Sequence, residues 1–231
     1  MYVNDEAKFS AVFPARNENE SLSISVPFLV RHSILVGEVL VVVDSASDKS
    51  FLAQEVLKSL PVPVNFVLNS HKGVFGAIQT GVANAKFETV IVAAADEIYP
   101  LLKFDAMARV LLEGSDFVSG TRYALGGKRY GGNLTGRVLS TFANTLLKGI
   151  YRSAMSDFTT GYKGFQKKNW GSLSRDADGP GWSSALKFSL NAIRLGMIIK
   201  EIPIISLDRQ MGGESTFKFK LWFIGYIRKI F

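Results

Sequence analysis

The chain has 231 residues, of which 47% are hydrophobic and 20% charged, so we expect one large or two small folded domains and not a disordered chain. It contains no cysteine, which excludes disulfide scaffolds, thiolate zinc sites and cysteine nucleophiles. The two histidines, His32 and His71, argue against a multi-histidine metal centre or a Ser-His-Asp hydrolase. Lys and Arg exceed Asp and Glu by 27 to 20, and the net charge of +7 favours anionic partners such as phosphorylated ligands, nucleic acid or an acidic membrane face.

Neither a secretory signal nor a membrane span is indicated by the hydropathy pattern. Residues 1–8 lack the apolar core of a signal peptide. No window approaches the roughly 20 apolar residues that cross a bilayer. We therefore expect a cytoplasmic protein, either soluble or peripheral at the cytoplasmic face of the membrane.

Apolar runs alternate with stretches of helical length through the first half of the chain. The runs cover residues 9–13, 39–43, 64–68 and 89–95, and the helical stretches cover 19–31, 48–60, 73–85 and 101–113. Runs rich in Val and Ile without polar alternation are typical of strands buried on both faces of a parallel sheet. The alternation predicts a single-domain α/β, Rossmann-like fold with a mostly parallel sheet flanked by helices.

The second half is less regular, and we expect it to share the same sheet. Predicted strands cover 115–123, 160–166 and 198–207, predicted helices cover 135–151 and 183–195, and a glycine-rich loop covers 126–132. We find no internal repeat and no linker.

Ligands of such sheets bind beyond the carboxyl ends of the strands, so the residues that follow each apolar run are the candidate site. Pro14 is expected to end the first strand because it cannot continue a ladder, and Asn17 or Asn19 can cap the next helix. Taken alone, this segment is typical of a strand-to-helix turn. Asp44, at the tip of the second strand, is placed to bind a base or a ribose.

Two further strand ends carry features of a phosphate site. Lys72 and Gly73 open a helix whose N-terminus can attract phosphate, although their spacing fits neither a dinucleotide-binding loop nor a P-loop. Asp96 follows the fourth apolar run, where a carboxylate is costly unless a cation meets it. A divalent ion that bridges the phosphates of a ligand would supply that cation.

Together these segments resemble the family 2 glycosyltransferases, and among them the dolichol-phosphate (polyprenyl-phosphate) mannose synthase branch, over roughly residues 9–215. The matching segments are 14–18, 44–48, 73–81, 94–100, 120–123, 157–163, 201–204 and 209–215. The resemblance implies a GT-A-like fold and inverting transfer of a hexose from a GDP- or UDP-linked sugar to an acceptor, which in this branch is a polyprenyl phosphate. It implies Mg²⁺ or Mn²⁺ as cofactor.

The resemblance also implies roles for single residues. Glu18 and Asp44 would orient base and ribose, Asp96 would hold the metal, and Arg209 with Lys218 would neutralise the diphosphate. Arg122 and Arg137, with Ser140, match positions that hold the acceptor phosphate. The expected catalytic residues are thus Asp96, Arg122 and Arg209, and the expected substrate-binding residues are Pro14, Ala15, Arg16, Glu18, Asp44, Lys72, Ala95, Arg137, Ser140, Asp157 and Lys218. For each arginine the alternative is a solvated surface charge, and for Asp157 it is a turn residue.

The sequence departs from the family pattern at the metal and at the base. Ala94 stands where the family has the first aspartate of its D-A-D motif, so we expect weak metal binding without nucleotide, or its loss. Residues 181–184 lack the acidic base of relatives that glycosylate hydroxyls. A phosphate acceptor needs no base, which favours a lipid phosphate. A weakened nucleotide-sugar binding protein, or a transferase acting on a saccharide hydroxyl, is the alternative.

The last segment, 217–231, combines apolar and aromatic residues with Lys and Arg. We expect residues 1–216 to form the transferase domain, and 217–231 to form a helix that packs on the sheet or lies at a membrane interface. Basic residues are scattered along the chain and are not clustered with stacking aromatics, so we do not expect nucleic acid as a partner.

Overall fold

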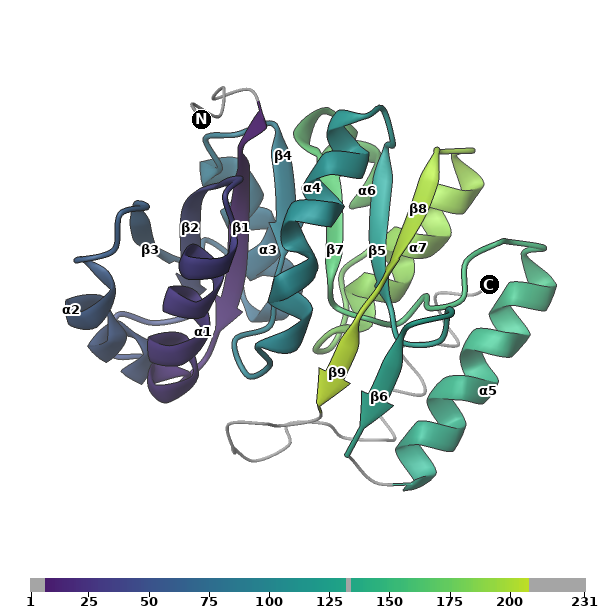
Figure 1. The fold of residues 1–231 in the computed structure, drawn as a ribbon, viewed down its shortest axis with the longest axis horizontal. Helices are drawn as coiled ribbons and strands as arrows, with labels where there is room; N and C mark the ends of the chain where they lie inside the picture. Colours follow the sequence, from purple (N-terminus) through teal and green to yellow (C-terminus); the bar gives the residue numbers. More distant parts are fainter. Residues whose placement is uncertain (1–6, 132–133, 208–231) are drawn as a thin grey trace.

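A computed structural model describes residues 7–131 and 134–207 of the chain. Its main sheet has seven strands in the order β3-β2-β1-β4-β7-β5-β8, and β6 and β9 form a separate two-stranded sheet (Figure 1). The strands are β1 (Phe9–Ala15), β2 (Val36–Val43), β3 (Val64–Leu68), β4 (Thr89–Val92), β5 (Phe117–Thr121), β6 (Lys128–Tyr130), β7 (Lys163–Gln166), β8 (Ile199–Pro203) and β9 (Ile205–Leu207). The helices are α1 (Asn19–His32), α2 (Gln54–Leu57), α3 (Gly73–Asn84), α4 (Phe104–Leu112), α5 (Leu134–Ile150), α6 (Trp170–Leu173) and α7 (Ser183–Arg194).

Both faces of the main sheet are covered by helices, as the unbroken apolar runs predict. On one face, α1 and α4 pack against strand residues such as Phe13 and Val41, and Phe104 meets Phe9 edge to face. On the other face, α3 and α7 pack against residues such as Val12 and Val42. The predicted α/β fold with a mostly parallel sheet is therefore confirmed.

The strand β7 runs antiparallel between β4 and β5, although the remaining pairs of the main sheet are parallel. Lys163 opens β7 and lies opposite Val92 of β4 and Ser119 of β5. Since β7 is reversed, its beginning lies at the edge where its neighbours end. The segment 157–162, which precedes β7, is thereby brought to the carboxyl edge of the sheet.

Several predicted boundaries were wrong. Pro14 lies within β1 and pairs with β2, which is tolerated because β4 accompanies β1 only as far as Val12. The predicted strand 89–95 ends at Val92, so Asp96 lies in a turn. The predicted helix 48–60 is largely a 3₁₀ helix, Lys49–Ala53, followed by the short α2.

Two further errors lie in the second half. The glycine-rich loop 126–132 contains β6, and the predicted strand 198–207 divides into β8 and β9. β8 completes the main sheet and β9 pairs with β6, so the chain passes from one sheet to the other at Ile204, whose side chain is buried.

The helix α5 lies at the rim of the fold and is covered only in part (Figure 1). Ser140, Asn144 and Leu147 are buried against the body of the protein. Large apolar side chains on the outer side of this helix are 48–72% exposed. These are Leu134, Val138, Phe142, Leu146 and Ile150. Among residues 7–131 and 134–207, the structure contains no helix with the length and hydropathy of a membrane span.

Candidate active site

The loops that follow β1 and β2 hold each other in place. The Asp48 carboxylate accepts hydrogen bonds from the backbone amides of Asn17 (2.9 Å) and Ser50 (2.8 Å). The Ser50 hydroxyl in turn accepts one from the amide of Glu18 (2.9 Å). Asn17 has a φ of 58°, in the left-handed region that asparagine tolerates better than most residues. This turn fixes the position of Glu18 at the start of α1.

Glu18 and Asp96 lie near one another although β1 and β4 supply them separately. Partial burial is the main cause that raises the pKa of Glu18, and the neighbouring carboxylates of Asp96 and Asp48 raise it further, while a hydrogen bond with Ser21 lowers it. Carboxylates that repel one another at the carboxyl edge of a sheet favour a cationic group between them. This part of the site is suited to a ligand that arrives with a cation.

Asp44 lies at the tip of β2, where its exposed carboxylate faces the end of the neighbouring strand. The side-chain amide of Asn69, directly after β3, donates to Asp44 Oδ1 at 2.6 Å. Lys72 precedes α3 and is exposed. Asp44 and Lys72 therefore lie at the carboxyl edge of the sheet, as the sequence predicts.

A second group of residues surrounds Tyr162, which precedes β7. Burial is the main cause that raises the pKa of Tyr162 well above its usual value, followed by the charges of Glu97 and Asp96, and Arg122 acts against them. Glu97 accepts a hydrogen bond from the Ser206 hydroxyl of β9 at 3.0 Å. Asp96 and Arg122 thus lie within electrostatic reach of one buried side chain.

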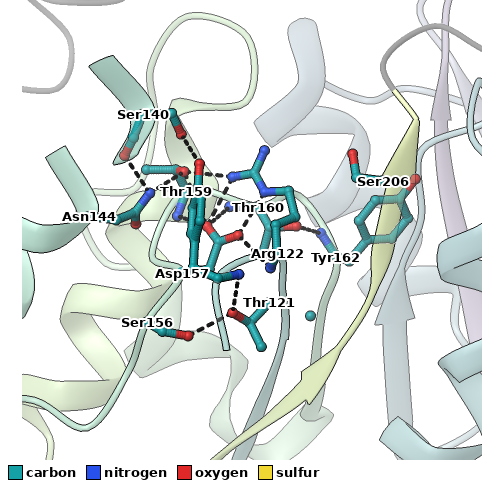
Figure 2. Close-up of polar contacts among 12 residues, drawn as sticks. Thr121, Arg122, Ser140, Asn144, Ser156, Asp157, Thr159, Thr160, Tyr162 and Ser206 are labelled. Atoms are coloured by element: carbon teal, nitrogen blue, oxygen red, sulfur yellow. Dashed lines mark hydrogen bonds and ion pairs between the residues drawn. The ribbon is translucent and has the colours of Figure 1, made fainter. Parts of the chain in front are cut away.

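Arg122, which follows β5, forms a two-pronged ion pair with Asp157 (Figure 2). Its Nε donates to Asp157 Oδ2 at 2.7 Å and its Nη2 donates to Oδ1 at 3.0 Å and to the Thr159 hydroxyl at 2.9 Å. The Asp157 side chain is fully buried and that of Arg122 is 12% exposed. Burial alone would raise the pKa of Asp157, but Arg122 holds it below its usual value. The pair fixes the 157–162 turn against β5.

Two more ionisable side chains support the same turn. Lys163 is fully buried and donates to the hydroxyls of Ser119 and Ser189, each at 2.8 Å, and to the Asp157 carbonyl at 3.3 Å. Burial lowers the pKa of Lys163 to about 7, although Asp157 and Glu201 act to raise it. Glu201 of β8 accepts from the backbone amide of Asp157 at 2.9 Å.

The same network reaches α5. The Tyr123 hydroxyl donates to Ser140 Oγ at 2.8 Å, and the Asn144 amide donates to the Ser140 carbonyl at 2.8 Å and to the Thr159 hydroxyl at 3.2 Å (Figure 2). Arg137, one turn before Ser140, is exposed on the outer side of the helix. Although only three positions separate them, Ser140 is buried against the body of the protein and Arg137 is exposed.

The structure places most of the expected site residues at one edge of the sheet. Pro14 and Ala15 end β1, Arg16 is exposed beyond them, and Ala95 is buried beside Asp96. Arg209 and Lys218 lie outside the described residues, as do residues 213–216. The assignment of catalytic and binding roles to these residues stays a prediction.

The described residues do not by themselves build a metal site. Residues 7–131 and 134–207 contain no group of three or more His, Cys, Asp or Glu side chains that could hold an ion. An ion at Asp96 would therefore depend on a bound ligand for most of its coordination.

Sequence reasoning missed several residues that shape this edge. Asn69 orients Asp44 and directly follows the third apolar run, so the strand-end rule could have found it. Lys163 and Glu201 were recognised only as members of the segments 157–163 and 201–204. The sequence pattern of a strand does not indicate which distant residues a charged side chain within it contacts. Tyr162 is placed by the reversal of β7, which the sequence pattern did not indicate.

Comparison with known proteins agrees with this geometry. Residues 10–170 match the sequence profile described as Glycosyl transferase family 2. The polyprenol monophosphomannose synthase of Mycolicibacterium smegmatis is 25% identical over 227 residues, which cover 91% of this chain and 85% of that protein. A dolichol-phosphate mannosyltransferase of Pyrococcus furiosus is 31% identical over 125 residues, 52% of this chain and 35% of that protein.

Solved structures with the same fold include glucosyl-3-phosphoglycerate synthase of Mycobacterium tuberculosis. Its complex with Mn²⁺, UDP and glucosyl-3-phosphoglycerate superposes with a TM-score of 0.74 at 18% identity, covering 96% of this chain and 78% of that one. The same enzyme with Mg²⁺ and UDP gives a TM-score of 0.72 at 19% identity. At this identity the likeness establishes the fold.

Proposed function

The chain belongs to glycosyl transferase family 2 and is a glycosyltransferase, and from that premise we propose that it transfers a hexose, with inversion, from a nucleotide diphosphate sugar to a polyprenyl phosphate. Two relatives named for mannose transfer to polyprenol or dolichol phosphate support this acceptor. The donor class is supported by the nucleotide complexes of proteins with the same fold.

The donor would lie along the carboxyl edge of β1, β2 and β4. Asp44 and Glu18 would accept hydrogen bonds from base and ribose, and the diphosphate would pass Asp96, which is close enough to Glu18 to raise its pKa. A divalent ion bound by Asp96 together with the diphosphate oxygens would supply Lewis-acid stabilisation of the leaving group. Arg209 and Lys218 would add positive charge there, as the family resemblance implies.

The observation that carries the acceptor assignment is the exposed apolar side of α5. Its five large side chains follow one another at four-residue intervals, and Arg137 lies among them with its side chain exposed. An apolar surface beside a cation matches a lipid chain attached to a phosphate. Through Asn144 this helix is joined to Thr159 and so to the Arg122–Asp157 pair, and through Ser140 it is joined to Tyr123. We therefore place peripheral membrane contact at α5.

The residues at the start of α7 fit an acceptor that is already an anion. Residues 181–184, Gly-Trp-Ser-Ser, offer no carboxylate to remove a proton, and the side chains of Ser183 and Ser184 are buried. A phosphate oxygen attacks the anomeric carbon while the bond to the diphosphate breaks, and the bonding electrons leave with the diphosphate. No proton has to be removed from the acceptor. Transition-state stabilisation is then mostly electrostatic.

Transfer assays test the proposal. The full chain is incubated with Mg²⁺ or Mn²⁺, a radiolabelled donor (GDP-mannose or UDP-glucose) and either polyprenyl phosphate in phospholipid vesicles or 3-phosphoglycerate in solution. We expect label in the lipid fraction with one donor, and less of it with Arg137→Ala. Label found only in the phosphoglycerate product would refute polyprenyl phosphate as the acceptor. No label with either acceptor, from folded protein, would overturn the proposed function.

A further inference from the structure

Asn69 forms a short hydrogen bond to the carboxylate that faces the nucleotide edge. Its Nδ2 donates to Asp44 Oδ1 at 2.6 Å and to the Gly73 carbonyl at 3.3 Å. Asp44 is exposed, so a charge-assisted bond from one fixed neighbour restrains a side chain that would otherwise rotate freely. Asn69 comes from β3 and Asp44 from β2, so the bond joins two strand ends.

The orientation of the Asn69 amide is fixed by donors on its other side. The hydroxyl of Thr80, a buried residue of α3, donates to Asn69 Oδ1 at 3.0 Å, and the backbone amide of His71 donates to the same oxygen at 3.1 Å. The Thr80 hydroxyl also accepts a hydrogen bond from the amide of Ser70 at 3.1 Å. This bond uses a lone pair of the hydroxyl oxygen, so the single hydroxyl hydrogen is donated to Asn69 Oδ1. A flipped amide would set its NH₂ group against these donors.

The packing around this amide leaves little room for a different conformation. A Cβ on Gly76 would lie 2.6 Å from the Cβ of His71 and 3.3 Å from Asn69 Oδ1. The turn between β3 and α3 is thus closed tightly over Asn69. The amide can therefore present its NH₂ group to Asp44 and has no comparable alternative.

We propose that Asn69 is a positioning residue for the nucleoside part of the donor. It holds one oxygen of Asp44, so that the other oxygen is presented to an N–H or O–H group of the base or ribose. This inference rests on the proposed function and adds to it a residue that acts through Asp44. Donor affinity should depend on Asn69, and the rate of transfer from bound donor should not.

A double-mutant cycle on nucleotide binding tests the coupling. UDP and GDP, each with Mn²⁺, are titrated into wild type, Asn69→Ala, Asp44→Ala and the double variant, with Asn65→Ala of the same strand as a control. We expect Asn69→Ala to weaken binding about tenfold, as for loss of a charge-assisted hydrogen bond, and the double variant to bind no more weakly than Asp44→Ala. Losses that multiply in the double variant would overturn the inference.

Asn69→Asp gives a readout that a purely structural role would not produce. Two carboxylates would then face each other and repel, so Asp44 would lose its fixed hydrogen-bond donor without loss of side-chain volume at position 69. We expect this variant to bind nucleotide at least as weakly as Asn69→Ala. Binding as tight as that of wild type would contradict the inference. Melting temperatures of both variants near that of Asn65→Ala confirm that the turn is intact.

The outcomes separate this inference from the proposed function. If wild type binds neither nucleotide, the proposed function and the role of Asn69 are both refuted. If wild type binds nucleotide and Asp44→Ala does not, while both Asn69 variants bind as tightly as wild type, only the role of Asn69 is refuted. In transfer assays, we expect Asn69→Ala to raise the KM for the donor with kcat unchanged.

Discussion

The buried lysine makes the stability of this protein depend on pH in a direction that can be calculated. Lys163 is fully buried, and burial lowers its pKa from 10.5 to about 7. In the unfolded chain this amine binds a proton below about pH 10.5, whereas in the folded protein it does so only below about pH 7. Between these values the unfolded state binds more protons, so the free energy of unfolding rises with pH.

The expected size follows from the width of that window. One group that is protonated only in the unfolded state contributes about 1.4 kcal/mol for each pH unit, so two units give at most about 3 kcal/mol. The hydroxyl and carbonyl acceptors around Lys163 favour its charged form, which reduces the gain. We expect wild type to gain about 2 kcal/mol over Lys163→Met between pH 7.5 and 9.5.

The comparison with Lys163→Met isolates this group, because the other titratable residues are common to both proteins. Urea unfolding is followed by tryptophan fluorescence at pH 7.5, 8.5 and 9.5, and the difference in unfolding free energy is plotted against pH. The substitution itself changes the offset between the curves, while the titration changes their relative slope. Parallel curves would refute the assignment of a depressed pKa to Lys163.

Three further substitutions test the network, the turn and the outer helix face. Asp157→Asn leaves Arg122 buried without its counter-charge and should lower the free energy of unfolding by about 3 kcal/mol, measured by denaturation; a change below about 1 kcal/mol would show that the pair is solvated. Gly161→Ala places a Cβ 2.7 Å from the ring of Trp182 and should cost about 1–3 kcal/mol, with an unchanged melting temperature as the contrary result. Phe142→Glu alters a side chain that is 65% exposed, so we expect folding and nucleotide binding to persist. Sedimentation with anionic vesicles should fall severalfold, and sedimentation equal to that of wild type would exclude α5 from the membrane contact.

The first half of the fold could be predicted from sequence because β1, β2 and β4 are buried on both faces and have apolar sequences. β1, β2 and β3 contain few polar residues, and their parallel pairing requires the intervening helices that the spacing indicates. The strand-end rule then placed Asp44 and Asp96 correctly at one edge. Local residue patterns are sufficient here because each βα unit is built from neighbouring segments of the chain.

The second half could not be predicted as well because its contacts are non-local. The reversal of β7 between β4 and β5 depends on pairing across more than 40 residues, which periodicity does not reveal. The ion pair of Arg122 with Asp157 has the same origin: each residue alone reads as a surface charge or a turn residue. The inward orientation of Ser140 depends on Tyr123, which is 17 positions away.

The central claim is that a nucleotide diphosphate binds along the carboxyl edge shared by β1, β2 and β4. A crystal structure of the full chain grown with Mn²⁺ and UDP or GDP tests it most directly. We predict the nucleoside against Asp44 and the diphosphate beside Asp96, on the side that faces Tyr162. A nucleotide bound on another surface, with these side chains out of contact, would contradict the account.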